Sequence, residues 1–445
     1  MALIDFKVLP GIDKQDTASG AEFRWVDCNN TRFRYGLPEK VGGWSSLVTD
    51  TIVGVARREF AFVDLDGNRY VAIGTDKFLL IYFEGQLYDI TPLKTTLTSA
   101  TLATTDTSAI CSITTGTNHG LSVGDIVLLD TVTLPVGTGY VDADFENKLF
   151  QVTSITSATV FTITQSTAAT ATVGTGGSLS VKPYEQVGPA EQSYGYGWGI
   201  DTWSSGKWGE AASASDVSLE PGLWSLSNFG QVLVATIANG KTFTWNAGDA
   251  ARLTTRASTA TSGFETTNNP TATRITLVSP TTRHLIHLGT ETTIGDPTTQ
   301  DDMFIRFSDQ EDINDYVPTA INSAGSQRLQ DGTRIIGALK AKESILVWTD
   351  NALYTMKFIG APFTFGFEQV GTNCGLIGKN AAIEIDGMAF WMSSNGFFMF
   401  DGTVKSLPCS VEDYVYDQAD TTKGQQVYAG INNLFTEVVW YYPST

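Results

Sequence analysis

The stretch Phe60-Ala-Phe-Val-Asp-Leu-Asp-Gly-Asn-Arg-Tyr-Val-Ala-Ile73 decides the fold of this chain. It joins two runs of apolar and β-branched residues through Asp66-Gly67, and Asp-Gly between such runs is a strong signal for a β-hairpin. The chain continues through Lys77–Phe83, a Glu84-Gly85 turn and Gln86–Ile90. Four short strands in about forty residues predict one antiparallel meander.

The same alternation of short apolar runs and tight turns returns within residues 223–245, 335–370 and 382–407. A four-stranded unit that recurs every 40 to 50 residues or so is typical of propeller blades, because one twisted sheet cannot cover both of its faces alone. We therefore expect an all-β fold whose main domain is a β-propeller. Stacked β-sandwiches use similar strands and turns, and they stay open as the alternative.

Two segments depart from this repeat. Residues 1–50 are rich in turn formers and have no helical apolar period, so they predict an extended N-terminal segment. Residues 95–182 are dominated by Thr, Ser, Ala and Gly, which predicts an inserted β domain. Within it, we expect strands near residues 126–129, 150–152 and 160–163.

The remaining residues, 51–94 and 183–445, have room for about six propeller blades. The last blade looks incomplete, because the sequence stops just after the strand-like run Val438–Tyr442. Either the N-terminal segment supplies the missing strand or the natural chain is longer.

Composition excludes several classes of protein. Of 445 residues, 42% are hydrophobic and only 17% charged, so the chain is not broadly disordered. The net charge of −19 repels phosphate backbones and argues against a free nucleic-acid binder. No apolar run approaches the ~20 residues that span a membrane. Asp5 and Lys7 interrupt any secretory apolar segment, so we expect synthesis in a cytoplasm.

Neither the cysteines nor the histidines predict a reactive or metal site. The four cysteines form no CxxC pair, and we interpret them as small apolar residues: Cys28, Cys111, Cys374 and Cys409. The histidines are His119, His284 and His287. His284 and His287 are three residues apart in a strand-like run, which places their rings on opposite faces. We expect ordinary structural histidines.

Other motifs fail as catalytic signatures. Ala235–Thr242 ends like a phosphate-binding loop, but Ala235 stands where the first glycine is required and a strand follows where a helix should start, so we expect a hairpin turn. The carboxylates between Asp296 and Asp315 lack the spacing of a calcium loop and predict a solvated acidic loop. A glycosidase would need two of them at a fixed separation in a cleft. We expect no enzyme, no cofactor and no metal, and a secreted propeller hydrolase is the weakest hypothesis.

One aromatic stretch is a candidate contact surface. Tyr194–Gly209 alternates bulky rings with glycine, and Trp198, Trp203 and Trp208 are its candidate partner contacts. Aromatic rings are common at interface cores and can stack on sugars. The interpretation that we favour is a loop whose rings tuck between sheets, where glycine permits close turns.

Several segments together resemble the tail nozzle, or tail tubular B-type, proteins of short-tailed bacteriophages, especially those of marine phages. The resemblance is diffuse along the chain and clearest near its two ends. It is carried by Arg32-Phe-Arg-Tyr-Gly-Leu-Pro-Glu-Lys-Val-Gly-Gly-Trp44, by Tyr194–Gly209, by Arg306–Asp315, by Gly360–Gly378 and by Trp391-Met-Ser-Ser-Asn-Gly-Phe-Phe-Met-Phe-Asp-Gly402.

The resemblance implies a structural virion protein of the phage tail. Such subunits form a ring, usually a hexamer, below the adaptor and portal, and the ring carries tail fibres or spikes outside and conducts genomic DNA inside during ejection. The shared motifs are packing and turn motifs, so they carry over no active site. The alternative is a tail-associated receptor- or glycan-binding module that uses Trp198, Trp203 and Trp208. The charge of −19 fits a conduit whose acidic walls do not retain phosphates.

Overall fold

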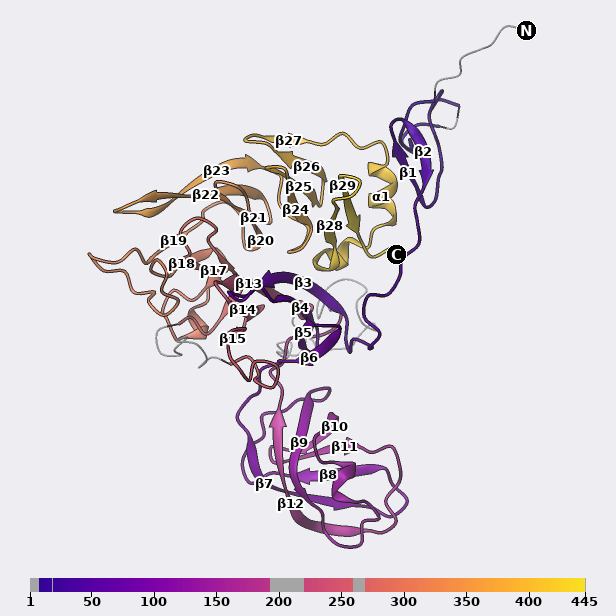
Figure 1. Cartoon of the computed structure of the whole chain (residues 1–445), viewed down its shortest axis with the longest axis vertical. Helices are drawn as coiled ribbons and strands as arrows, with labels where there is room; N and C mark the ends of the chain where they lie inside the picture. The colour runs from indigo at the N-terminus through magenta and orange to yellow at the C-terminus, as the bar shows by residue number, and fades with distance from the viewer. Residues whose placement is uncertain (1–7, 18, 193–219, 259–268, 445) are drawn as a thin grey trace, which may run out of the picture.

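The computed structural model describes residues 8–17, 19–192, 220–258 and 269–444. Figure 1 shows a propeller and, below it, a smaller barrel. This confirms the all-β propeller with an inserted β domain, and the stacked-sandwich alternative is wrong.

The propeller contains five blade sheets, each an antiparallel meander in chain order. The first is β3 (Ala56–Val63), β4 (Arg69–Thr75), β5 (Leu79–Phe83) and β6 (Gln86–Asp89), and the second is β13 (Trp224–Phe229), β14 (Val232–Ile237) and β15 (Thr242–Asn246). The third is β16 (Thr273–Val278), β17 (Leu285–Thr290), β18 (Phe304–Phe307) and β19 (Gly325–Arg328). The fourth is β20 (Ile335–Lys340), β21 (Ile345–Thr349), β22 (Ala352–Gly360) and β23 (Thr364–Thr372), and the fifth is β24 (Ala382–Ile385), β25 (Met388–Ser393), β26 (Gly396–Phe400) and β27 (Val404–Ser406).

A two-stranded sheet, β28 (Tyr428–Asn432) and β29 (Glu437–Tyr441), stands beside the fifth blade. The first strands of neighbouring sheets contact one another in the order β3, β13, β16, β20, β24 and β28. Strand β28 therefore occupies a sixth position around the axis. Where the sequence suggested about six blades, the described residues form five and this two-stranded sheet.

The third blade has no counterpart among the repeats that the sequence showed. Its four strands spread over residues 273–328, because loops of several residues to more than a dozen separate them. The regular spacing that identifies a blade is lost there. Its first two strands, β16 and β17, are nevertheless buried along their whole length, whereas the outermost strand, β19, is mostly exposed.

The N-terminal segment contains a hairpin that the sequence did not predict, formed by β1 (Thr31–Arg34) and β2 (Leu37–Lys40). Its turn, Tyr35-Gly36, has positive φ at both residues, 51° and 81°, as a two-residue hairpin requires. Tyrosine rarely adopts this conformation, so the sequence carried no turn signal. These two strands pair with each other and not with β28 or β29, so the idea that residues 1–50 complete the last blade is wrong for the described residues.

The insert is a closed six-stranded barrel with strand order β10-β11-β8-β7-β12-β9. Its strands are β7 (Leu97–Thr104), β8 (Ile110–Thr114), β9 (Ile126–Thr133), β10 (Lys148–Ser157), β11 (Val160–Thr164) and β12 (Val173–Pro183). The strands alternate buried apolar with exposed polar residues, and Leu102, Ile113 and Phe161 are among the fully buried ones. Closure leaves no unpaired sheet edge.

The junction between barrel and propeller is built around Tyr184, just after β12. The Tyr184 hydroxyl donates to Asp89 Oδ2 at 2.6 Å, and Arg256 donates to the same carboxylate at 3.0 Å. The Tyr184 ring packs edge-on against Phe78, with 5.6 Å between centroids. The barrel is therefore held to the first and second blades by the two chain connections, by the ring contact and by the ion pair.

Tryptophans fill the spaces between blades. Trp224 of the second blade is fully buried, and its Nε1 donates to the backbone oxygen of Thr75 in the first blade at 2.9 Å. Gly74 leaves room for it, since a Cβ there would lie 2.6 Å from the Trp224 ring. Trp348 and Trp391 meet edge to face between the fourth and fifth blades, 5.4 Å apart. Burial of these large rings contributes much of the apolar stabilisation at these two interfaces, between the first and second blades and between the fourth and fifth.

The helical part of the described chain is small. It comprises α1 (Glu412–Gln418) and the short 3-10 turns η1 (Asp142–Asp144), η4 (Pro297–Thr299) and η5 (Thr421–Gln426). Within the described ranges, none of these helices has the length and apolar character needed to cross a bilayer.

The histidine expectation is confirmed for the third blade. His284 and His287 are both fully buried and have separate partners. His287 Nε2 lies 3.0 Å from the Tyr316 hydroxyl, and His284 Nε2 lies 3.0 Å from Ser323 Oγ. Burial, with the nearby Arg306 charge, lowers the pKa of His287 to about 3.

This burial predicts acid sensitivity. Because His287 is neutral in the folded state and ordinary in the unfolded one, the unfolded chain takes up the extra proton as the pH falls below about 6.5. We expect His287 to make the free energy of unfolding fall by about 1 kcal/mol per pH unit between pH 6 and 4. In His287→Gln this slope should decrease, as measured by urea unfolding followed by tryptophan fluorescence. Tyr316→Phe, which keeps the histidine, should retain the slope; equal slopes in all three proteins would contradict the assignment.

Candidate functional site

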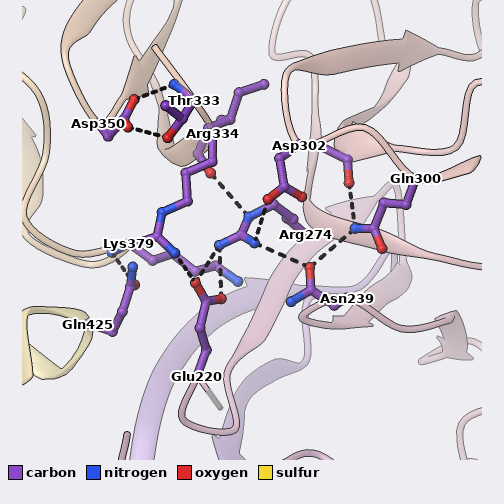
Figure 2. A network of polar contacts seen from close by, with 12 residues as sticks. Glu220, Asn239, Arg274, Gln300, Asp302, Thr333, Arg334, Asp350, Lys379 and Gln425 are labelled. Atoms are coloured by element: carbon purple, nitrogen blue, oxygen red, sulfur yellow. Dashed lines mark hydrogen bonds and ion pairs between the residues drawn. The ribbon is translucent and has the colours of Figure 1, made fainter. Parts of the chain in front are cut away.

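A network of charged side chains connects several blades near the propeller axis (Figure 2). Most of its members lie at or just before the first, innermost strand of a blade. Its centre is Glu220, which lies before β13. Both carboxylate oxygens of Glu220 accept from Arg274 Nη2 at 2.8 Å, and Oε1 also accepts from Arg334 Nη1 at 2.7 Å. Arg274 belongs to the third blade and Arg334 precedes the fourth. One carboxylate therefore ties three neighbouring blades together.

Arg274 is held from several sides. Its Nη1 lies 3.4 Å from Asp302 Oδ2, and its Nε donates to the backbone oxygen of Ile335 at 3.3 Å. Gly289 lies against its stem, where an added Cβ would come within 2.6 Å of Arg274 Cδ and φ is +65°. Only glycine fits that position, so the close approach of β16 and β17 shapes the guanidinium site.

Two lysines reach across the axis to the second blade. Lys379 Nζ donates to Ser225 Oγ at 2.7 Å, and Lys340 Nζ donates to Ser227 Oγ at 3.0 Å. Burial, together with the nearby Arg58 charge, lowers the pKa of Lys379 to about 7 and that of Lys340 to about 8. The hydroxyl partners are neutral, so they do not balance these charges.

The axial network therefore carries more positive than negative charge. Its basic members are Arg58, Arg274, Arg334, Lys340 and Lys379, and its carboxylates are Glu220 and Asp302. In a chain with a net charge of −19, this is a local reversal of sign. Such a reversal in a partly buried region marks a candidate binding site.

A cavity of about 290 Å³ opens next to this network, between β3 and the sheet β28–β29. We call this place the seam. Arg58 crosses it, and its Nη1 donates to Asn380 Oδ1 at 3.2 Å. Gln425 Oε1 accepts from the Lys379 backbone N–H at 3.2 Å and so connects the seam to the axial network. The polar side chains that line the cavity include Arg57, Arg58, Asn380, Gln426, Tyr428 and Tyr441.

A second kind of candidate site is the exposed apolar surface of residues 31–47, which we call the arm. Trp44 is 88% exposed, and Tyr35, Leu37 and Leu47 are exposed as well. The arm is anchored on the last sheet, where Arg32 Nε lies 3.5 Å from Glu437 Oε1 and the guanidinium stacks 3.4 Å from the Phe435 ring. It carries three basic residues and one acidic residue: Arg32, Arg34, Lys40 and Glu39.

A contrasting surface lies on the other side of the propeller (Figure 1). We call it the rim: the loop 309–323 together with residues 358–364, which comprise the end of β22, the turn and the start of β23. Thr364 Oγ1 donates to the Ser323 backbone oxygen at 2.9 Å and joins the two parts. Ile321 is 98% exposed, and Val317, Ile359 and Phe363 are exposed too. The loop contains no Lys or Arg, and its acidic residues are Asp309, Glu311, Asp312 and Asp315.

The structure places the other sequence candidates as follows. Trp198, Trp203 and Trp208 lie outside the described residues. Residues 238–241 form the predicted turn between β14 and β15. Among the described residues, no three His, Cys, Asp or Glu side chains gather as a metal site would require. All four cysteines are free; Cys111 and Cys374 are buried, and burial raises the pKa of Cys374 to about 11.

Sequence reasoning missed the axial residues. Glu220, Arg274, Arg334 and Lys379 are separated by 40 residues or more, and no local motif surrounds them. Their shared property is their place at or just before the inner strand of a blade. These positions would correspond in an alignment of the blades. The long loops of the third blade prevent such an alignment from the sequence, because its strands are not regularly spaced.

Fold and site together define an all-β propeller protein with an ion-paired axis and two unlike exposed surfaces. No protein-family model matches the chain, and no curated protein sequence matches it. Among solved structures, the phage phi92 endosialidase matches over 80% of this chain with 14% identity and a TM-score of 0.25. AztD from Citrobacter koseri matches over 79% with 11% identity and a TM-score of 0.31. The chain spans 55% of the endosialidase and 70% of that AztD chain, and at these TM-scores neither match carries a function.

The axial network predicts a large cost for removing its central carboxylate. Glu220→Gln leaves Arg274 and Arg334 without a counter-charge in a partly buried place, so we expect a loss of about 3 kcal/mol in the free energy of unfolding. Asp302→Asn is the matched control: its side chain is 40% exposed and 3.4 Å from Arg274, and should cost less than about 1 kcal/mol. Tryptophan fluorescence does not report on the inserted barrel, because residues 95–182 contain no tryptophan. Equal costs for the two variants would contradict a central role of Glu220.

Proposed function

We propose that this chain is a structural subunit of the tail nozzle of a short-tailed bacteriophage, and that copies assemble head to tail into a closed ring. The observation that carries the proposal is the pair of unlike surfaces, the arm and the rim, on opposite sides of the propeller (Figure 1). The resemblance of Arg32–Trp44 and the other segments to nozzle proteins supports the same class.

A ring requires two different, complementary faces on each subunit, because a contact of one patch with itself closes a dimer. The arm is anchored at the sixth position of the propeller, and the rim belongs to the third and fourth blades. The arm offers exposed rings and surplus basic charge, and the rim offers exposed aliphatic and aromatic side chains and surplus acidic charge. A second copy of the chain is therefore the partner whose chemistry fits each surface.

The ion-paired axis supports a structural role for the propeller. Glu220, Arg274 and Arg334 satisfy one another across three blades, which stiffens a building block. In the proposed assembly, DNA would pass through the channel between subunits and not along this axis. The adaptor, the tail fibres or spikes and the location in the virion tail belong to the same proposal.

Head-to-tail assembly has a specific signature in mixing experiments. We expect an arm variant, Trp44→Asp with Leu47→Asp, and a rim variant, Val317→Asp with Ile321→Asp, each to lose self-association. Their mixture should form dimers and stop there, because only one intact arm and one intact rim remain. Sedimentation velocity measures all three samples, and added salt should weaken the dimer.

The matched control is the barrel variant Val123→Asp with Val136→Asp, which adds the same charge at exposed sites and should assemble like the unchanged protein. A mixture that stays monomeric while the unchanged protein self-associates would contradict arm-to-rim pairing.

The nozzle role itself is tested in phage particles. We expect particles made without this chain to lose their packaged DNA and their infectivity, as measured by encapsidated DNA and plaque assay. Supplying the unchanged chain in trans should restore both. Sealed and infectious particles without the chain would overturn the proposal, and so would turnover of a glycoside by the isolated protein.

A further inference from the structure

The seam exists because the sixth position of the propeller holds only two strands. Strand β3 of the first blade faces β28 there, and the cavity of about 290 Å³ lies between them. One water molecule takes up about 30 Å³ of liquid, so the space exceeds what one or two waters fill. The seam is therefore large enough for a small molecule.

Two donors at the seam have no acceptor. Arg57 Nε and Gln426 Nε2 are buried from solvent, and neither has a hydrogen-bond partner among the described residues. Both residues line the cavity. The remaining contacts of Arg57 do not involve this atom, since its Nη2 donates to the Ala190 backbone oxygen. A buried donor left unpaired costs about 1–3 kcal/mol, so two such donors at one cavity call for an acceptor group.

The charge at the seam points to the kind of acceptor. Arg57 and Arg58 line the cavity. Lys379 is connected to it through Gln425, whose side-chain oxygen accepts from the Lys379 backbone N–H. Burial lowers the pKa of Arg58, and the charge of Arg58 in turn lowers the pKa of Lys340 and Lys379. Glu59 is the carboxylate on the cavity wall, and it is exposed to solvent. Asp76 and Glu191 partly offset the charge of Arg57, and Glu220 partly offsets that of Lys379. Arg58 donates to the neutral Asn380 amide, so a negative group in the cavity would stabilise its charge.

We propose that the seam cavity binds a small oxyanion, a phosphate or a carboxylate compound, through Arg57, Arg58 and Gln426. Guanidinium groups bind such planar or tetrahedral oxygens with charge-assisted hydrogen bonds, and the Gln426 amide adds a neutral donor. Asn380, whose Nδ2 donates to the Arg57 backbone oxygen at 3.0 Å, holds the two strands in register around the ligand.

A bound oxyanion would link two segments of the propeller that are far apart in sequence. It would connect β3 of the first blade with residues before β28, where the ring of sheets is closed by side chains instead of a full blade. A ligand that binds only the folded state stabilises it by mass action. The proposal does not depend on the nozzle role, because it concerns closure of the propeller within one subunit.

The test uses the full chain with inorganic phosphate and citrate as probes, and sodium chloride of equal ionic strength as the reference. We expect phosphate or citrate to raise the Tm followed by tryptophan fluorescence, and titration calorimetry to show one site per chain. Arg58→Gln should weaken binding about tenfold or more. Arg283→Gln, which removes an exposed arginine of the third blade, should bind like the unchanged protein.

Gln426→Leu separates binding from a purely structural role. It replaces an unpaired buried amide by an apolar group of similar shape, so the ligand-free Tm should stay equal or rise, while the rise on adding phosphate or citrate should shrink. A response to phosphate supports a phosphate-type ligand, and a response to citrate alone supports a carboxylate ligand. The proposal is overturned if neither probe exceeds chloride, or if Arg58→Gln and Gln426→Leu keep the full response.

Discussion

The ion pairs of Glu220 with Arg274 and Arg334 are the constraint on which the propeller depends. In the described part of the chain, the inner strands of neighbouring blades share no backbone ladder, and isolated backbone bridges such as Gly240–Thr273 and Asn380–Tyr428 join neighbouring sheets. Side chains add further connections at the axis. Glu220 does this for three blades with bonds of 2.7 and 2.8 Å, and the tryptophans between sheets add the apolar contacts. Partly buried charges are stable only when each charged group lies at hydrogen-bond distance from a group of opposite charge. Few other arrangements of these side chains are therefore possible at the axis.

The sixth position of the propeller is unusual because it holds two strands instead of a full blade. Five sheets and the two strands β28 and β29 close a circle that full blades would otherwise fill. The consequence is local: a cavity, unpaired donors and closely spaced cations occur together at the seam. A region where packing is incomplete but charge is concentrated is suited to a ligand.

The outer surfaces of the propeller differ from its interior in which side chains they expose. Apolar side chains on the arm and the rim remain exposed although the core has ample apolar residues, and each surface carries its own sign of charge. Exposed apolar groups of this kind are characteristic of contact surfaces. In the proposed ring, the ion-paired interior would provide a stiff subunit, and the two unlike surfaces would provide a directional contact between copies.

The sequence by itself determined the fold class, a β-propeller with an inserted β domain, because hairpin turns such as Asp66-Gly67 and alternating apolar residues are local signals. It also predicted that His284 and His287 are structural histidines, and both are buried with separate hydrogen-bond partners. It missed the third blade, the Tyr35-Gly36 hairpin and half of the barrel strands, where long loops, an unusual turn residue or Thr- and Gly-rich segments weaken those signals. Only the tertiary structure decided the axial network and the seam, because Arg58, Glu220, Lys379 and Gln426 are distant in sequence and meet only when the ring of blades closes.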